Sequence, residues 1–263
     1  MPVIAITADR GVPKKVLDKL AAETSLPLLS PSLHADYRLH IKTDYLECQK
    51  VTPLKKKLKI DSIHIDFVGG KLNHRRLHGG GKGQDIAKAI GLHKISNPAV
   101  LDLTAGMGGD AFVLASLGAN VTMIERNPVV FALLKDALER LSMNADNELQ
   151  AIHQRLTLHK QNAIVFLEKL NKNNLPDVIY LDPMFPERNK SAQVKKEMQF
   201  FHDIVGSDAD AEKLFLAALP HANKRIVVKR PRLAPPLSDT VKSDFSITGK
   251  STRYDIYLPK HHI

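Results

Sequence analysis

The chain is 263 residues long, 43% hydrophobic, and carries a formal net charge of +10 at pH 7. This length suffices for one large domain or for a catalytic domain with a small companion, and the composition excludes a disordered chain. The sequence has no apolar run near the ~20 residues that span a bilayer and no leader-like opening, so we expect a soluble, cytoplasmic protein. Its single cysteine, Cys48, excludes an internal disulfide and a cysteine-rich metal site.

Positive charge is concentrated in one stretch of the chain. Residues 50–94 contain eleven lysines and arginines but only three acids. Concentrated positive charge attracts a polyanion because binding releases the counterions held by its phosphates, whereas scattered charge mainly aids solubility. The stretch therefore indicates a nucleic-acid partner, although a basic face without a partner has the same composition.

The first part of the chain predicts a small α/β unit. Residues 3–6 are typical of a short strand, and residues 13–26 of a helix with one apolar face. Residues 37–46 and 58–67 alternate partly between apolar and polar side chains, as in strands with one wet face.

A glycine-rich basic segment follows at residues 69–83. Such dense glycine indicates a mobile backbone or one that a ligand approaches closely. Three of its cations are candidates for phosphate contacts: Arg75, Arg76 and Lys82. We predict a connection that contacts nucleic acid or closes like a lid, with an ordinary basic linker as the alternative. The small unit would then span residues 1–75 and the catalytic domain residues 76–263.

The remainder of the chain is organised around residues 100–110, VLDLTAGMGGD. A run of strand formers leads into Gly106, Gly108 and Gly109 and then directly into a helical pattern, with Asp110 at its start. Glycine accepts positive φ and lets a ligand approach the backbone, and the first N–H groups of a helix bind polar or anionic groups. We predict a loop that holds a nucleotide-like cofactor. The spacing differs from the dinucleotide pattern G-x-G-x-x-G, and a plain connecting turn is the alternative.

Two further predicted strands end in acids. Residues 120–125 end in Glu125, where a ribose-binding acid belongs in a βαβ nucleotide fold. Residues 177–182 end in Asp182, which Pro183 and Phe185 follow. The carboxyl ends of strands in an open α/β sheet share one edge, so these pieces converge with the glycine loop on one crevice. Helix or strand capping by the two acids and a core position for the aromatic are the alternatives.

The rest of the chain continues this alternation of helices and strands. The predicted elements are a helix at 128–142, a strand at 156–159, helices at 163–170, 192–200 and 209–219, a strand at 225–229, and a terminal pair at 245–248 and 254–258. Strands that alternate with helices require a mostly parallel sheet covered on both faces, so the predicted fold class is α/β.

The motifs resemble those of class I S-adenosylmethionine-dependent methyltransferases. Amino-methylating members carry an Asp/Asn-Pro-Pro-aromatic motif where this chain has Asp182-Pro183-Met184-Phe185. From about residue 69 onward, the chain is similar to the ribosomal RNA small subunit methyltransferase J family. The sequences that carry this similarity lie at 104–112, 125–128, 180–186, 194–198 and 228–231. This resemblance implies a Rossmann-like sheet and methylation of the exocyclic N2 of a guanine in small-subunit (16S) rRNA. The implied partner is that rRNA or the assembled small subunit, with no obligate protein partner.

The resemblance also implies roles for the cofactor-binding residues. Gly106, Gly108 and Gly109 would admit the methionine portion of S-adenosylmethionine, with Asp110 and Asp182 close by. Glu125 would bind the ribose hydroxyls. The adenine would be bordered by Arg126 and flanked by Gln161 and Asn162, although these last two depart from the small hydroxyl residues expected there.

The acceptor side follows from the same motif. Asp182 would accept one hydrogen of the amine and a carbonyl at or near Pro183 the other, while Phe185 offers a stacking face. Lys229 and Arg230, with Arg232, are candidates for holding the RNA backbone, a solvated strand end being the alternative. No pair among the twelve histidines has metal-ligand spacing with suitable neighbours, so we predict no catalytic metal.

Other functions compete with this interpretation. The same motif logic serves a DNA adenine or a protein amide as acceptor, and an inactive RNA-binding ribosome assembly factor would keep the same fold. A nicotinamide dehydrogenase is disfavoured, because the glycine spacing is wrong and the Asp-Pro-Met-Phe strand end would be unexplained.

Overall fold

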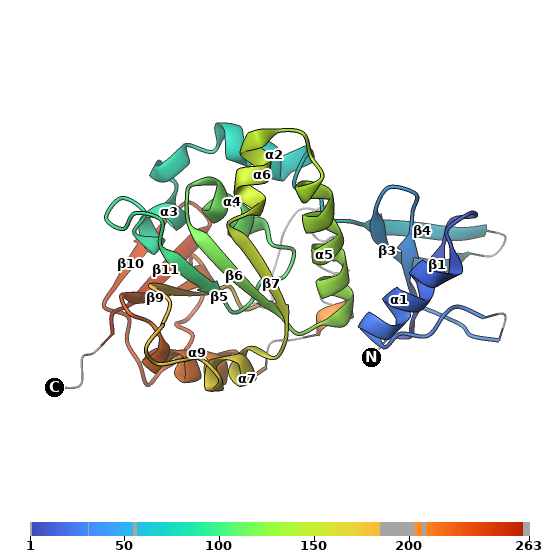
Figure 1. The fold of residues 1–263 in the computed structure, drawn as a ribbon. Coiled ribbons are helices and arrows are strands. Elements are labelled where there is room, and N and C mark those ends of the chain that lie inside the picture. Colours follow the sequence, from blue (N-terminus) through green and yellow to red (C-terminus); the bar gives the residue numbers. More distant parts are fainter. Residues whose placement is uncertain (1, 31, 55–56, 185–202, 207–208, 260–263) are drawn as a thin grey trace. The chain divides into compact units, whose positions relative to one another are not determined.

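The computed structural model describes residues 2–30, 32–54, 57–184, 203–206 and 209–259 (Figure 1). They pack as two compact units. One consists of residues up to Asp66 with Asn127–Met143 and residues 203–206, and the other of Phe67–Arg126 with residues 144–184 and 209–259. We still propose that the chain has two parts. We place the first boundary between them after Asp66 rather than after residue 75, because a boundary between residues 75 and 76 would divide the helix Gly70–His78.

The first unit is built on a four-stranded sheet. Its strands are β1 (Ile4–Ala8), β2 (Tyr37–Ile41), β3 (Leu46–Leu54) and β4 (Lys57–Ile63), paired in chain order, with only the first pair parallel. The sequence does not predict β3, because Glu47 and Gln49 are of residue types that usually face solvent. In the structure Glu47 and Gln49 are buried, and the Gln49 amide donates to the Glu47 carboxylate over 2.6 Å.

Two helices whose bounds lie within the described residues pack in this unit. α1 (Lys14–Thr24) packs on β1, and α5 (Pro128–Ser142) packs on β3 and on α1. The predicted helix at 128–142 is confirmed as α5, which the Asn127 side chain caps by accepting the N–H groups of Val129 and Val130. An ion pair between Lys135 and Glu23 joins the two helices.

The second unit contains a seven-stranded sheet in the order β10-β11-β9-β8-β5-β6-β7. The strands are β5 (Ala99–Asp102), β6 (Asn120–Glu125), β7 (Leu156–Lys160), β8 (Val178–Leu181), β9 (Arg225–Pro231), β10 (Phe245–Thr248) and β11 (Thr252–Tyr257). β5 to β9 are parallel, whereas β11 runs antiparallel to both of its neighbours. The mostly parallel sheet with a terminal pair is therefore confirmed. The strand order reverses between β5 and β8, which is where ligands bind in such sheets.

Helices cover both faces of this sheet (Figure 1). They are α2 (Gly70–His78), α3 (Asp85–Ile90), α4 (Gly109–Ser116), α6 (Asn147–His153), α7 (Ala163–Glu168) and α9 (Ala211–Ala218), with 3₁₀ turns at Gly81–Gly83 and Leu219–His221. α7 and α9 pack together over an apolar cluster from β5, β8 and β9, whereas α4 contacts α2, α3 and α6. None of the helices in the described ranges is long and apolar enough to cross a membrane.

Two of these helices differ from what the sequence predicts. Much of the glycine-rich segment forms a regular helix, α2, because its glycines flank a run with few breakers. α6 is not predicted, since only Leu149 and Ile152 of its short sequence are buried. The helix predicted at 192–200 lies outside the described residues.

Candidate active site

The glycine loop after β5 has the conformation that its sequence predicts. Gly106 and Gly108 have φ angles of 52° and 71°, in the left-handed region that a Cβ disfavours. Gly108 stands immediately before α4, and a Cβ at Gly109 would lie 3.2 Å from Cδ2 of Leu72. The tight turn and the close approach of α2 therefore both select glycine here.

Hydrogen bonds tie this loop to the two neighbouring strand ends. The N–H of Gly106 donates to Oε2 of Glu125 over 3.1 Å, so the buried acid that ends β6 lies against the loop. The N–H of Asp182 donates to Oγ1 of Thr104 over 2.6 Å. The carboxyl ends of β5, β6 and β8 thus meet at one edge, as the sequence predicts.

An ionic cluster occupies this edge, centred on Asp110 in the first turn of α4. One of its carboxylate oxygens accepts the Tyr180 hydroxyl and the Nζ of Lys229, both at 2.7 Å, and the other accepts Nη1 of Arg75 at 2.9 Å. Lys229 also donates to Oδ2 of Asp182 over 2.7 Å. Two acids and two cations therefore join α2, α4, β8 and β9 beside the predicted acceptor site.

The surroundings of the cluster shift its protonation equilibria. Burial alone would raise the pKa of Asp110, but the charges of Lys229 and Arg75 and the hydrogen bonds from Lys229 and Tyr180 outweigh it and hold that pKa at about 2. Burial would lower the pKa of Lys229, yet the two carboxylates raise it above its ordinary value. At Asp102, at the end of β5, burial raises the pKa to about 7 against the opposing effect of the Thr104 N–H. Asp110 and Lys229 are thus both charged at neutral pH, whereas Asp102 titrates there.

The cations predicted to contact RNA have different surroundings from one another. Arg75 and Lys229 belong to the ionic cluster. Arg76 lies 2.7 Å from the Glu148 carboxylate, and its side chain is only 7% exposed. Lys82, in the turn before α3, is exposed.

Arg230 requires a correction. It is 5% exposed, and its guanidinium donates twice to the carbonyl of Pro235, at 3.1 and 3.2 Å. A side chain so enclosed offers no surface to a phosphate, so we no longer propose Arg230 as an RNA contact. The loop after β9 is held in place by this arginine instead.

The residues predicted to border the adenine lie at the ends of β6 and β7. Arg126 pairs with Asp210 at 2.6 Å, and the side chain of Asn162 caps α7 by accepting the N–H groups of its first turn. The N–H of Gln161 donates to the carbonyl of Glu125 over 3.1 Å. These positions adjoin Glu125, and a role for them in cofactor binding stays a prediction.

Several residues of this edge lie within the quoted motifs but receive no role from the sequence. Tyr180, Thr104 and Asp102 supply the hydroxyl groups and the buried acid described above. A polar residue at the end of an apolar strand is the only sequence signal for them. Pro183 is buried directly after Asp182, and Phe185 lies outside the described residues.

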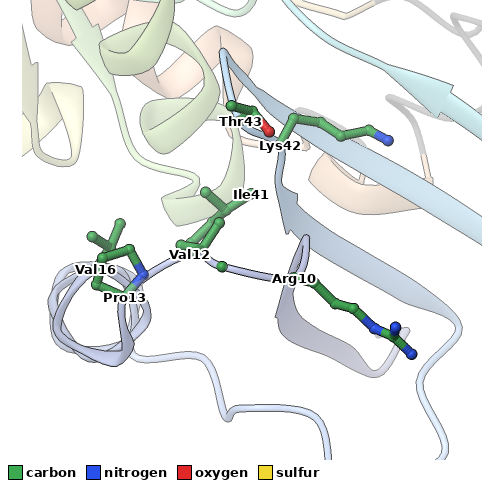
Figure 2. A pocket seen from close by; sticks show the side chains of 8 residues that line it. Arg10, Val12, Pro13, Val16, Ile41, Lys42 and Thr43 are labelled. Carbon is green, nitrogen blue, oxygen red and sulfur yellow. The ribbon is translucent and has the colours of Figure 1, made fainter.

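A separate cavity of about 390 Å³ lies in the first unit, between the turn after β1 and the end of β2 (Figure 2). Figure 2 shows the apolar side chains of Val12, Val16 and Ile41 close together, with the side chains of Arg10 and Lys42 extending away from them. It contains none of the predicted site residues.

The order of the seven strands, the glycine loop after β5 and the Asp-Pro end of β8 together define a class I S-adenosylmethionine-dependent methyltransferase. A family model described as "Putative SAM-dependent methyltransferase" matches residues 20–259. The ribosomal RNA small subunit methyltransferase J of Cellvibrio japonicus is 53% identical, covering 76% of each chain, and that of Saccharophagus degradans is 44% identical, covering 92% of each. The chain belongs to this family, which confirms the resemblance seen in its motifs.

A solved structure supports the same conclusion for the fold. The crystal structure of a SAM-dependent methyltransferase from Neisseria gonorrhoeae matches with a TM-score of 0.74 and 35% identity, covering 98% of this chain and 97% of that one. The similarity extends over both units of the chain, so it includes the first unit, which the motifs scarcely cover.

Proposed function

We propose that this protein transfers the methyl group of S-adenosylmethionine to the exocyclic N2 amine of a guanine in small-subunit (16S) rRNA. Two curated relatives are named as small-subunit rRNA methyltransferases, which supports both the reaction and the RNA. The position of Asp182 beside the glycine loop is the observation that supports an amine as the methyl acceptor, because a carboxylate at this position can accept a hydrogen bond from an amine N–H.

The residues at the edge of the sheet fit the cofactor. The glycine turn has the positive-φ backbone that lets a ligand approach closely, and Glu125 beside it supplies a carboxylate that accepts from hydroxyl groups. When bound, S-adenosylmethionine supplies a methyl group that its sulfonium has already activated. The protein's task is therefore mainly to align the acceptor amine with that methyl.

Asp182 is the residue that we propose to orient the amine. The lone pair of a guanine amine is delocalised into the ring, and accepting its hydrogens localises the pair toward the methyl. Lys229 holds Oδ2 of Asp182, and Thr104 accepts its N–H, so two contacts fix this residue from both sides. Pro183 contributes no N–H that would compete for the carboxylate.

The base must leave its stack to reach this edge, as in other enzymes that act on nucleobases. Phe185 follows in the motif, and we propose it as the stacking face for the base, worth about 1–3 kcal/mol. This assignment rests on the motif alone.

The deciding experiment is the transfer of labelled methyl from S-adenosylmethionine to undermethylated small ribosomal subunits, followed by digestion to nucleosides. We expect the label in N2-methylguanosine. Naked rRNA in a parallel reaction distinguishes the free RNA from the assembled subunit as substrate.

The other outcomes separate the alternatives. A different methylated nucleoside in the rRNA would contradict the N2 assignment while keeping the reaction. Unlabelled rRNA together with measurable cofactor binding would favour a DNA or protein acceptor, and loss of cofactor binding as well would favour an inactive assembly factor.

A further inference from the structure

The loop after β9, residues 232–236, presents an apolar side chain to solvent at the catalytic edge. Leu233 is 92% exposed, the largest value for any big hydrophobic side chain in the described ranges; Met143 follows at 79%. Arg232, its neighbour, is also exposed. A single exposed leucine is common in proteins, so its meaning depends on how the loop is held and where it lies.

Two arginines hold this loop firmly. Arg230 donates twice to the carbonyl of Pro235, and Nη1 of Arg253 donates to the carbonyls of Arg232 and Ala234 at 3.1 and 3.0 Å. Charge-assisted hydrogen bonds of this kind are stronger than neutral ones. The backbone on both sides of Leu233 is therefore fixed, and the exposure of this leucine is a property of the folded loop.

The bracing arginine on β11 is itself held in place. Arg253 forms two hydrogen bonds with Asp255, at 2.7 and 2.9 Å, and that acid is buried. The Asp255 carboxylate is thus bound to the arginine that holds the loop. Buried charge is costly unless it is paired, and Arg253 supplies the partner of this acid.

The loop lies close to the ionic cluster. Leu233 follows Lys229 by four residues, which limits their separation to about 14 Å at ~3.3–3.6 Å per residue. Lys229 in turn lies 2.7 Å from the Asp182 carboxylate. The exposed leucine is therefore within a few nucleotides' reach of the proposed acceptor site.

A second exposed cation borders the loop. The N–H of Arg232 donates to the carbonyl of Ser251 over 2.9 Å, which places the turn between β10 and β11 alongside. Lys250, in that turn, is exposed. The turn also approaches Asp85, whose carboxylate lies 3.4 Å from Lys88. The rim thus presents an apolar side chain next to Arg232 and Lys250.

We infer that residues 232–236 form a docking element for the RNA substrate, in which Leu233 packs on an unstacked base or sugar near the target nucleotide and Arg232 and Lys250 bind flanking phosphates. The inference rests on the proposed function, because it takes RNA as the substrate. Cations position a nucleic-acid backbone and carry no sequence information, whereas apolar side chains contact or separate unstacked bases. A rigid loop that combines the two suits an RNA whose target base is turned out.

The test compares Leu233→Ala and Arg232→Ala with two control variants. Lys224→Ala removes a cation from the opposite end of β9, and Leu216→Ala removes an exposed leucine from α9. Steady-state kinetics with undermethylated small subunits, over a range of salt concentrations, give KM for RNA and KM for S-adenosylmethionine.

We expect Leu233→Ala to raise KM for RNA about three- to tenfold, with its salt dependence unchanged, because it removes apolar contact only. Arg232→Ala should raise the same KM. It should also reduce the salt slope, which is the slope of log KM for RNA against log salt concentration, by about one, because one phosphate contact is lost. Neither should change KM for S-adenosylmethionine or the melting temperature. The two control variants should match the parent protein.

Unchanged KM for RNA in both loop variants would overturn the inference, and so would equal effects in the controls. A parallel loss of cofactor affinity would also overturn it, because the loop would then act by holding the ionic cluster. Failure of the proposed function has a different signature: the parent protein itself would not methylate the subunit.

Discussion

Two neighbouring regions of the catalytic edge use the same kind of side chain in opposite ways. Lys229, inside β9, lies between the carboxylates of Asp110 and Asp182, whereas Arg232, just beyond the strand, faces solvent. In the sequence both belong to one basic run, KRPR. The difference teaches that a cation is available to RNA only where the fold leaves it without an internal carboxylate or carbonyl to bind.

The largest effect should come from the acid that Lys229 holds. Asp182→Asn should reduce kcat about 10²–10⁴-fold while leaving S-adenosylmethionine binding largely intact, because the amide accepts the amine hydrogen poorly. Asp177→Asn is the matched control, since it changes the acid at the other end of β8. Joint loss of turnover and cofactor binding would instead make Asp182 a cofactor or folding residue.

Lys229→Met tests the buried side of the comparison. It leaves Asp182 without the cation that fixes Oδ2, so we expect kcat to fall about ten- to hundredfold, as misplacement of a reacting group does. Lys229→Arg should restore part of the activity. A measurement of the salt slope of KM for RNA discriminates the two roles: a slope reduced by about one would mean that Lys229 contacts phosphate, as its sequence suggests.

Asp102 tests the electrostatics beneath the cluster. Its pKa of about 7 lies above the ordinary 3.8, so the folded protein keeps a proton that the unfolded chain releases. The free energy of unfolding therefore loses a contribution as pH rises from about 4 to 7, about 1.4 kcal/mol for each unit of pKa difference. Asp102→Asn should remove this loss. In urea unfolding, the free energy of unfolding of the variant relative to that of the parent protein should therefore increase between pH 4 and pH 8. An equal difference at both pH values would contradict the raised pKa.

The smallest effect separates two cations of the glycine-rich segment. Lys82 is exposed, so Lys82→Ala should reduce the salt slope of RNA binding by about one and leave kcat nearly unchanged. Arg75 binds Asp110 and Gln84, so Arg75→Ala should lower kcat a few fold without that change in slope. Identical salt slopes for the two variants would remove the distinction between a cation that is paired with a carboxylate of the protein and one that is exposed.

Much of the fold is predictable from local sequence. Regular spacing of apolar residues predicts the strands and helices of the seven-stranded sheet, and the glycines at 106 and 108 predict a turn with positive φ. β3 and α6 are not predictable in this way. Glu47 and Gln49 of β3 hydrogen-bond to each other inside the protein, and only the folded chain decides that these polar side chains are buried.

The sequence by itself determined the class of protein and the convergence of Gly106, Glu125 and Asp182 on one edge. Parallel strands bring their carboxyl ends together whatever the details of packing, so strand-end residues reveal their neighbours. Only the tertiary structure decided which cations serve the protein and which face solvent. Successive side chains of a strand point to opposite faces, so Lys229 reaches Asp110 while Arg230 turns to the carbonyl of Pro235. Their partners come from distant elements, and no local pattern encodes that meeting.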